Sequence, residues 1–252
     1  MRRLAIVIAL LAATGATEAA EIDAFISTAI KAATDELLAP FERANGHTIR
    51  ASYAPSGALI PRFNRGEPVD VFLTDSAAID ELIKLGKIVG GRTDLARTGI
   101  GIAVRKGAPK PDVSSPEALK RTLLAAKTVG HAAPAGGSIT AAHIQGVFQQ
   151  LGIAAQVAPK VKLAAGGPNG RVSALVSSGK AEIGLQQVSE LMSNPEVEVI
   201  GLLPPGLQLI TIYSAGVTAS AREVEAAMAL IKALTEPSAA PIYKAMGLDP
   251  AW

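Results

Sequence analysis

The sequence predicts an α/β fold built mainly on parallel strands. Short apolar runs alternate with amphipathic runs of helical period along almost the whole chain, which is typical of sheets whose strands are joined by helices. A local pattern also repeats: an apolar strand, a turn of small or hydroxyl-bearing residues, then a helix. In its clearest copy, from Ile49 to Asp75, the turn is Pro55-Ser56-Gly57. The repeat therefore places hydroxyl groups at the starts of helices.

The individual elements follow from the period of the apolar residues. Strands are predicted where apolar residues form short runs, and helices where they recur every three or four residues. Several helices end at a glycine, such as Gly86 and Gly152, which is a typical stop signal. The predicted strands are 22–26, 49–53, 69–73, 100–104, 128–132, 157–163, 183–186, 197–202 and 209–219. The predicted helices are 29–44, 58–64, 79–85, 116–126, 140–151, 171–178, 221–234 and 238–246.

Two segments predict that the chain crosses between two lobes. One is the apolar strand 98–105, and the other is 203–218, which begins near Pro204-Pro205-Gly206. Two such strands form a hinge with a ligand cleft between the lobes. A single doubly wound domain is the alternative, because chains of this length often form one domain. The expected division is 21–103 and 206–252 in lobe I, and 104–205 in lobe II.

Residues 1–20 have the pattern of a secretory signal peptide. Arg2 and Arg3 precede an apolar stretch, and small residues at Ala19 and Ala20 offer a cleavage point. The stretch is short for a membrane span, although a retained anchor is the alternative. We therefore expect an exported protein.

The composition excludes several classes of function. The formal net charge of +2 is too small for a protein that binds nucleic acid through its phosphates. The absence of cysteine excludes disulfides, thiolate catalysis and cysteine-ligated zinc. The three histidines lack metal-ligand spacing, and the paired glycines lack the lysine of a phosphate-binding loop. We expect no metal and no cofactor.

The turns at the helix starts predict a site for a small anion. The first N–H groups of a helix have no partner within the helix, and the helix dipole adds positive partial charge there. Such a site holds an oxyanion or a carboxylate without a cationic side chain. The candidate turns are Ser27-Thr28, Pro55-Ser56-Gly57, 136–140 and 166–169.

Several stretches resemble one known family, the periplasmic molybdate-binding (ModA-like) solute-binding proteins of ABC transporters. The most specific is SYAPSGALIPRFNRGEPVDVFLTDSAAIDELIKLGKI, and SALVSSGKAEIGLQQVSEL and PIYKAMGLDP also match. The resemblance covers residues 21–252. It implies a two-lobed periplasmic binding protein of type II, a monomer that closes on a small anion and delivers it to a membrane permease.

The resemblance also implies which residues contact the ligand. The first family serine falls on Ala29, directly after Thr28, and the second matches Ser56. Two backbone N–H contacts fall near Ser138 to Thr140 and near Asn169, and a tyrosine hydroxyl falls on Gln187. Ala29 and Gln187 depart from the molybdate pattern. The predicted ligand-binding residues are Thr28, Ala29, Lys31, Ser56, Ser138, Thr140, Asn169 and Gln187, and none is predicted to be catalytic.

Three further residues leave their roles open. Lys31 lies in the first turn of a predicted helix, where a cation is unfavourable, so it either reaches a carboxylate or is only solvated. Arg171 begins a helix, and a bidentate arginine–carboxylate contact suits an organic acid better than a tetrahedral oxyanion. His143 lies one helical step after Thr140 and is a candidate proton carrier. Ser56 itself has a purely structural alternative, as an N-cap.

A binding protein for a molybdate-like oxyanion is the favoured interpretation of the sequence. The alternatives are a binding protein for an organic acid and an enzyme that isomerises a small polycarboxylate, in the manner of aconitate isomerase. In the enzyme, His143 or Lys31 would move the proton. A sensory or scavenging module without a dedicated transporter also fits. The chain has no nucleophile–base pair in sequence, which favours binding over catalysis.

Overall fold

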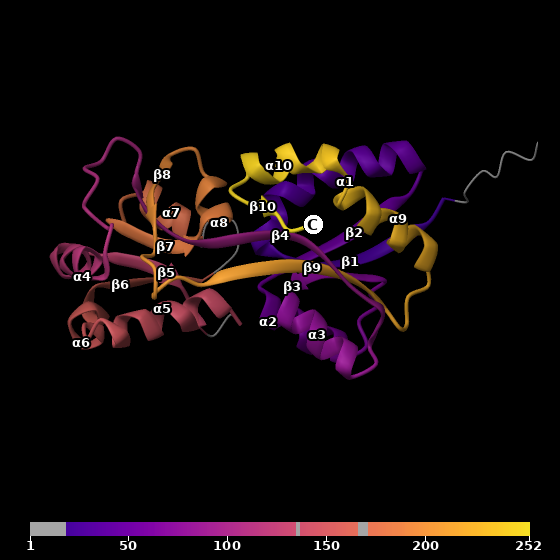
Figure 1. The fold of residues 1–252 in the computed structure, drawn as a ribbon, viewed down its shortest axis with the longest axis horizontal. Helices are drawn as coiled ribbons and strands as arrows, with labels where there is room; N and C mark the ends of the chain where they lie inside the picture. The colour runs from indigo at the N-terminus through magenta and orange to yellow at the C-terminus, as the bar shows by residue number, and fades with distance from the viewer. Residues whose placement is uncertain (1–18, 135–136, 166–170) are drawn as a thin grey trace, which may run out of the picture.

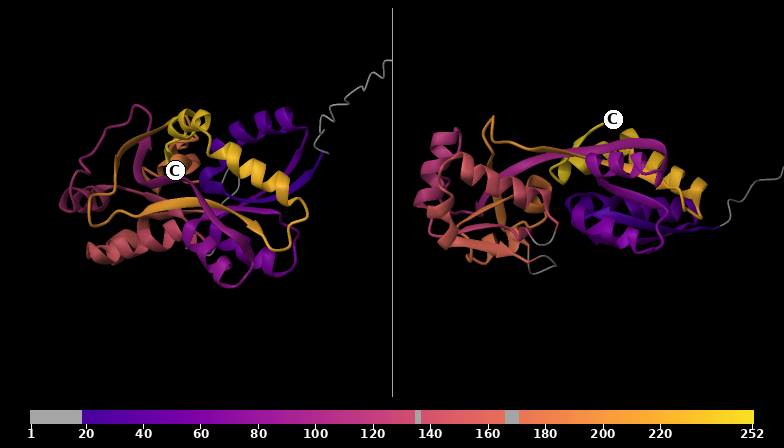
Figure 2. Two further views of the ribbon diagram at one scale, coloured as in Figure 1. Left: turned by 45° about the vertical axis from the view of Figure 1, so that its right-hand side comes forward. Right: turned by 90° about the horizontal axis from the view of Figure 1, so that it is seen from below.

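The protein consists of two α/β lobes joined by two long strands (Figure 1). The computed structural model describes residues 19–134, 137–165 and 171–252. The expected signal peptide therefore lies almost wholly outside the described residues, as do Gly136 and Asn169. Within these ranges, no helix is both long enough and apolar enough to cross a membrane. Figure 2 shows the two lobes from two further sides.

Lobe I is built on three parallel strands, β1 (Glu21–Ser27), β2 (Thr48–Ala54) and β3 (Val71–Asp75), in the order β2-β1-β3. Each of the first two strands runs directly into a turn and a helix, as the repeat predicts. The helices of this lobe are η1 (Thr28–Ile30), α1 (Lys31–Asn45), α2 (Ser56–Asn64), α3 (Ser76–Lys84), α9 (Val224–Leu234), η4 (Pro237–Ala239) and α10 (Ala240–Ala245). The short strand β10 (Asp249–Pro250) ends the lobe.

Lobe II repeats the same plan with a smaller sheet. Its strands β5 (Val129–Ala132), β6 (Val161–Ala164) and β7 (Ile183–Gln187) are parallel, and β8 (Val197–Leu202) lies beside the crossing strand. The helices are α4 (Pro116–Ala125), α5 (Ile139–Gln150), α6 (Ala154–Val157), η3 (Ala158–Lys160), α7 (Val172–Ser177) and α8 (Val188–Met192).

The strands β4 (Ile88–Arg105) and β9 (Ile210–Thr218) form the hinge. β4 pairs with β9 as far as the Gly99–Ile210 pair, and from Ile100 onward it pairs with β7 and β8 of lobe II. The second crossing runs from the end of β8 to β9. Both hinge strands are antiparallel to their neighbours, so each lobe has a mixed sheet in which the parallel part lies away from the hinge. The lobe boundaries at 103/104 and 205/206 stay a prediction.

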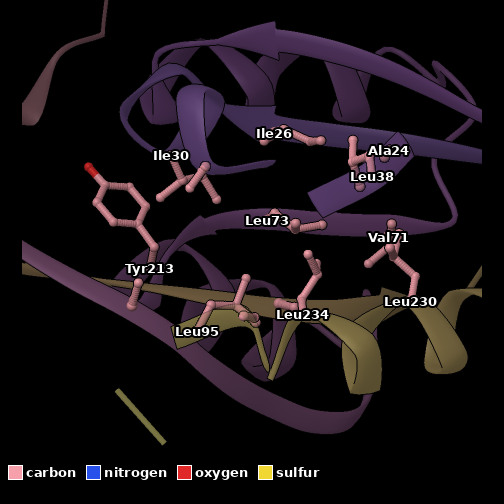
Figure 3. Close-up of a cluster of buried hydrophobic side chains, with 14 of the residues drawn as sticks. Ala24, Ile26, Ile30, Leu38, Val71, Leu73, Leu95, Tyr213, Leu230 and Leu234 are labelled. Carbon is pink, nitrogen blue, oxygen red and sulfur yellow. The ribbon is translucent and has the colours of Figure 1, made fainter. Parts of the chain in front are cut away.

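Each lobe has its own apolar core. In lobe I, residues of β1 and β3 pack against α1 and α9 through Ile26, Leu73 and Leu230 (Figure 3). Tyr213 of β9 lies at one end of this core beside Ile30, and its oxygen points away from the apolar side chains (Figure 3). A buried aromatic residue at the end of a core thus brings a hydroxyl group to the region between the lobes.

Three of the differences between the structure and the predicted elements have a clear local cause. The strand predicted at 157–163 begins only at Val161, because the alanine-rich stretch before it forms α6 and a 3-10 turn that contains Pro159. β4 is far longer than 100–104, because its first half pairs with β9. Helix α8 was not predicted, since five residues are too few to show a helical period.

Candidate functional site

A cavity of about 470 Å³ lies between the two lobes. One wall comes from η1, α1 and the β2–α2 turn of lobe I, and the opposite wall from the starts of α5 and α7 in lobe II. The residues between these walls belong to β7, α8 and β9. The lining residues are Ser27, Thr28, Ala29, Lys31, Tyr53, Ala54, Pro55, Ser56, Ala132, Ala133, Ser138, Ile139, Thr140, Ala164, Ala165, Arg171, Val172, Gln186, Glu190 and Tyr213.

Two serines of lobe I meet at the cavity wall. Ser27 ends β1 and N-caps η1, where its Oγ accepts a hydrogen bond from the N–H of Ala29 at 3.4 Å. The Oγ of Ser56 donates to the Oγ of Ser27 at 3.2 Å. Ser56 is the first residue of α2, whose N-cap is Pro55, so its hydroxyl does not cap the helix. The capping alternative for Ser56 is therefore wrong, and its hydroxyl stands at the start of α2, where the N–H of Gly57 donates to the Gly137 carbonyl and that of Ala58 to the Pro55 carbonyl.

The start of α5 faces these serines from lobe II. Ser138 N-caps α5 by accepting a hydrogen bond from the N–H of Ala141 at 3.2 Å, and Thr140 is buried in the first turn. The backbone N–H of Gly57 donates to the carbonyl of Gly137 at 3.2 Å, so the two lobes touch at the cavity mouth. A Cβ built on Gly57 would lie 2.7 Å from that carbonyl oxygen. Two glycines are thus required for this contact between the lobes.

Two cationic side chains line opposite walls of the cavity. Lys31 is the first residue of α1, and its Nζ lies 2.6 Å from a carboxylate oxygen of Asp35 and 4.0 Å from the centre of the Tyr53 ring. The Tyr53 hydroxyl donates to the same Asp35 at 2.8 Å. The carboxylate of Asp35 therefore offsets the charge of Lys31. Arg171 lies directly before α7 in lobe II.

A carboxyl group, Glu190, lines the cavity between the lobes. It belongs to α8, which packs against η1 on one side and α7 on the other. Burial raises the pKa of Glu190 to about 7, while the nearby charge of Arg171 and a hydrogen bond from Thr28 act in the opposite direction. This carboxyl group is therefore partly protonated at neutral pH.

The glutamine pair ends β7 beside Glu190. The Gln186 side chain lines the cavity, whereas the Gln187 amide is held by hydrogen bonds from the Tyr213 hydroxyl at 2.7 Å and to Thr211 at 3.3 Å. We expected Gln187 to enter the cleft. Gln187 instead lies in the protein interior, and Gln186 and Tyr213 line the cavity.

Of the predicted ligand-binding residues, the structure brings six together at one cavity. These are Thr28, Ala29, Lys31, Ser56, Ser138 and Thr140. Asn169 lies outside the described residues. His143 does not line the cavity, because its Nε2 lies 2.7 Å from the carbonyl oxygen of Leu207 on the far side of α5. Within the described ranges, no group of three or more histidine, aspartate or glutamate residues is placed to hold a metal ion.

Sequence reasoning missed four polar residues at the cavity: Tyr53, Gln186, Glu190 and Tyr213. Glu190 carries little signal in sequence, since it lies inside the short helix α8 and not in the turn directly after β7. Tyr213 carries none, because it reads as one more apolar position of a long strand. Only the crossing of β9 between the lobes brings its hydroxyl to the cavity.

Comparison with known proteins places the chain in a family. The family model of the bacterial extracellular solute-binding proteins matches residues 22–249. An aconitate isomerase from a Pseudomonas species is 34% identical over 221 residues, which cover 85% of this chain and 82% of that protein. The molybdate-binding protein ModA of Azotobacter vinelandii is 28% identical over 241 residues, 92% of this chain and 91% of that protein.

The fold agrees with this assignment. A solved periplasmic molybdate-binding protein from Azotobacter vinelandii superposes with a TM-score of 0.72 at 18% identity, over 90% of this chain and 98% of that one. The two-lobed type II fold that the sequence predicts is therefore confirmed. On these grounds the chain belongs to the bacterial extracellular solute-binding protein family and is a ModA-like member of it.

Proposed function

We propose that the protein binds a small polycarboxylate in the cleft and isomerises it, with aconitate as the substrate. The observation that carries this proposal is the charge set of the cavity, in which Arg171 and Lys31 lie on opposite walls with Glu190 between them. The 34% identity with an aconitate isomerase supports it. Aconitate is an unsaturated tricarboxylate, so it needs partners for three separate carboxylates.

The size of the cavity favours an organic acid over a compact ion. If each of four oxygens takes no more than the roughly 30 Å³ of a water molecule, a tetrahedral oxyanion fills at most about 120 Å³. The cavity measures about 470 Å³. Cavities of roughly 300 Å³ and more are typical of small organic ligands. The sequence alone favoured the compact ion slightly, and the cavity reverses that preference.

The neutral hydrogen-bond donors and the cationic side chains of the cavity bind different carboxylates of the ligand. Hydroxyls at the starts of α2 and α5, with the first N–H groups of α5, offer one carboxylate a site of the helix-end type. Arg171 offers a second carboxylate a bidentate partner from the other wall. Lys31 shares its charge with Asp35, so we expect Arg171 to contribute more to binding than Lys31.

Transport of a compact oxyanion is the second candidate function. The paired hydroxyls of Ser27 and Ser56 and the capped start of α5 support it, because such neutral groups hold an oxyanion without help from a cation. In this case the protein delivers its ligand to an ABC permease.

We propose a periplasmic location for either function, after removal of the signal peptide. Mass spectrometry of the protein from a periplasmic extract tests this, and an intact N-terminus contradicts it.

The two functions are separated by one ligand series. Thermal unfolding is measured with cis-aconitate, trans-aconitate, citrate, molybdate, tungstate and sulfate, and turnover of each aconitate isomer is followed by proton NMR. A ligand at a hundred times its Kd adds about 2.7 kcal/mol to the free energy of unfolding. We expect stabilisation by aconitate and conversion of one isomer into the other. Stabilisation by molybdate alone, without turnover of aconitate, would establish the second candidate instead.

A matched pair of arginine variants tests the role of Arg171. Arg171→Met removes the cation from the cavity, and Arg43→Met removes a cation from an exposed position on α1. Loss of a charged hydrogen bond weakens aconitate binding by about 1.5–3 kcal/mol in the first variant and leaves the second unchanged. Equal affinity of both variants for aconitate contradicts the polycarboxylate assignment.

A further inference from the structure

Glu190 stands out among the ionisable groups of the cavity. Of the described residues that line the cavity, five carry an ionisable side chain: Lys31, Tyr53, Arg171, Glu190 and Tyr213. Arginine does not release its proton in proteins, and the charge of Lys31 is held by Asp35. Burial raises the pKa of both tyrosine hydroxyls above their ordinary value. Glu190 is left as the group that exchanges a proton at neutral pH.

The surroundings of Glu190 keep it available to a ligand. The side chain is half-buried and lies between η1 and α7. Arg171, directly before α7, acts on it through space, and no ion pair within 4.0 Å joins the two in the described part of the chain. Thr28 donates a hydrogen bond from η1, and Tyr213 approaches from β9. Among the described residues, the carboxyl group is thus not locked in a salt bridge.

We infer that Glu190 is the catalytic residue that carries the proton in the isomerisation, an inference that rests on the proposed function. As a carboxylate, Glu190 removes a proton from the methylene carbon of aconitate, which breaks one C–H bond. The electron pair of that bond forms a new double bond to the central carbon, and the pair of the original double bond moves to the former alkene carbon. Glu190 then returns its proton to the former alkene carbon and forms one C–H bond. One proton leaves and one returns, so the step consumes no co-reactant.

The charges around the cavity suit this step. The electrons that leave the C–H bond spread over the allylic carbons and the carboxylates attached to them. Arg171 and Lys31 stabilise that negative charge from the two walls. A carboxyl group with a pKa of about 7 accepts and returns a proton with similar ease at neutral pH.

The test compares Glu190→Gln with wild type and with Glu36→Gln. Glu36 is an exposed residue of α1 outside the cavity, so its variant controls for loss of a carboxylate. For each protein, Kd for trans-aconitate is measured by calorimetry and kcat by NMR. We expect kcat of Glu190→Gln to fall by about 10²–10⁴-fold while Kd changes by less than about tenfold. Glu190→Asp, which keeps the proton carrier, recovers part of the rate.

The outcomes separate this inference from the proposed function. Turnover by wild type that persists in Glu190→Gln overturns the inference alone. Binding of trans-aconitate without turnover by wild type overturns the enzymatic part of the proposed function and this inference together. A loss of binding in Glu190→Gln as large as the loss of kcat assigns the residue to ligand binding and also overturns the inference.

Discussion

The two lobes meet at two glycines, and we expect closure of the cleft to depend on this contact. The N–H of Gly57 in α2 donates to the carbonyl of Gly137 before α5 at 3.2 Å. In Gly57→Ala, the new Cβ would lie 2.7 Å from the Gly137 oxygen, and ordinary contact begins at 3.4 Å. The lobes must therefore separate at this point, and the hydrogen bond between them lengthens. Separation of the lobes would remove this contact, so the substitution penalises the closed arrangement described here.

The expected loss of ligand affinity follows from the steric overlap and from the weakened hydrogen bond between the lobes. Overpacking a close contact costs about 1–3 kcal/mol, and a net hydrogen bond contributes about 0.5–1.5 kcal/mol. A ligand that binds only the closed form bears this penalty in full. We therefore expect the affinity of the stabilising anion to fall by about 2–4 kcal/mol, which is about 30- to 1,000-fold in Kd.

Calorimetry of Gly57→Ala beside Gly146→Ala measures this effect. Gly146 lies within α5, and a Cβ there meets nothing within 4 Å, so the second variant makes the same chemical change in open space. Without ligand, neither variant loses thermal stability, because alanine is favoured over glycine in a helix. Wild-type affinity in Gly57→Ala, or an equal loss in Gly146→Ala, refutes the closure argument.

Two other substitutions give equally definite results. Ser56→Ala removes a hydroxyl that does not cap α2, so calorimetry should show a loss of about 1.5–3 kcal/mol in anion binding with little change in unfolding; a shift in unfolding without a shift in Kd contradicts this. Glu190→Gln should stabilise the protein at pH 8. Since the pKa of Glu190 is raised from 4.5 to about 7, the folded protein holds a proton that the unfolded chain releases, and its stability declines as pH rises through this range. A pKa difference is worth about 1.36 kcal/mol per unit, so the free energy of unfolding of Glu190→Gln should exceed that of wild type by up to about 3 kcal/mol above pH 7 and should equal it below pH 4.5. Urea unfolding at pH 8 and at pH 4 measures this difference. An equal gain at pH 8 and at pH 4 contradicts the raised pKa of Glu190.

The parts of the site that sequence predicts are the parts that local structure determines. A hydroxyl-bearing residue after an apolar strand stands at a helix start whatever the rest of the chain does, and Ser56 and Ser138 follow this rule. The strand–helix alternation likewise predicts an α/β fold, because each strand needs a helix to cover it. The parts of the site that depend on pairing between strands far apart in the sequence cannot be predicted in this way.

The glutamine pair shows why. Alternation along β7 requires that one of Gln186 and Gln187 faces the cavity, but the sequence does not say which. The answer is set by pairing with β4, where Ile100 lies opposite Gln187, and by Tyr213 of β9, which binds the Gln187 amide. Both partners lie in the hinge strands. A cleft formed between lobes is therefore less predictable than either lobe alone.

The charges of the cleft connect ligand binding to protonation. The Lys31 ammonium is offset by Asp35, so the balance at the cavity rests on Arg171 and Glu190. A polyanion that enters the cleft repels an ionised Glu190 and favours its protonated form. By linkage, such a ligand binds together with a proton whenever the pH lies near or above the pKa of about 7. Because proton removal needs the carboxylate, the proposed isomerisation proceeds from the complexes in which Glu190 stays ionised, and the positive charge of Arg171 favours that form.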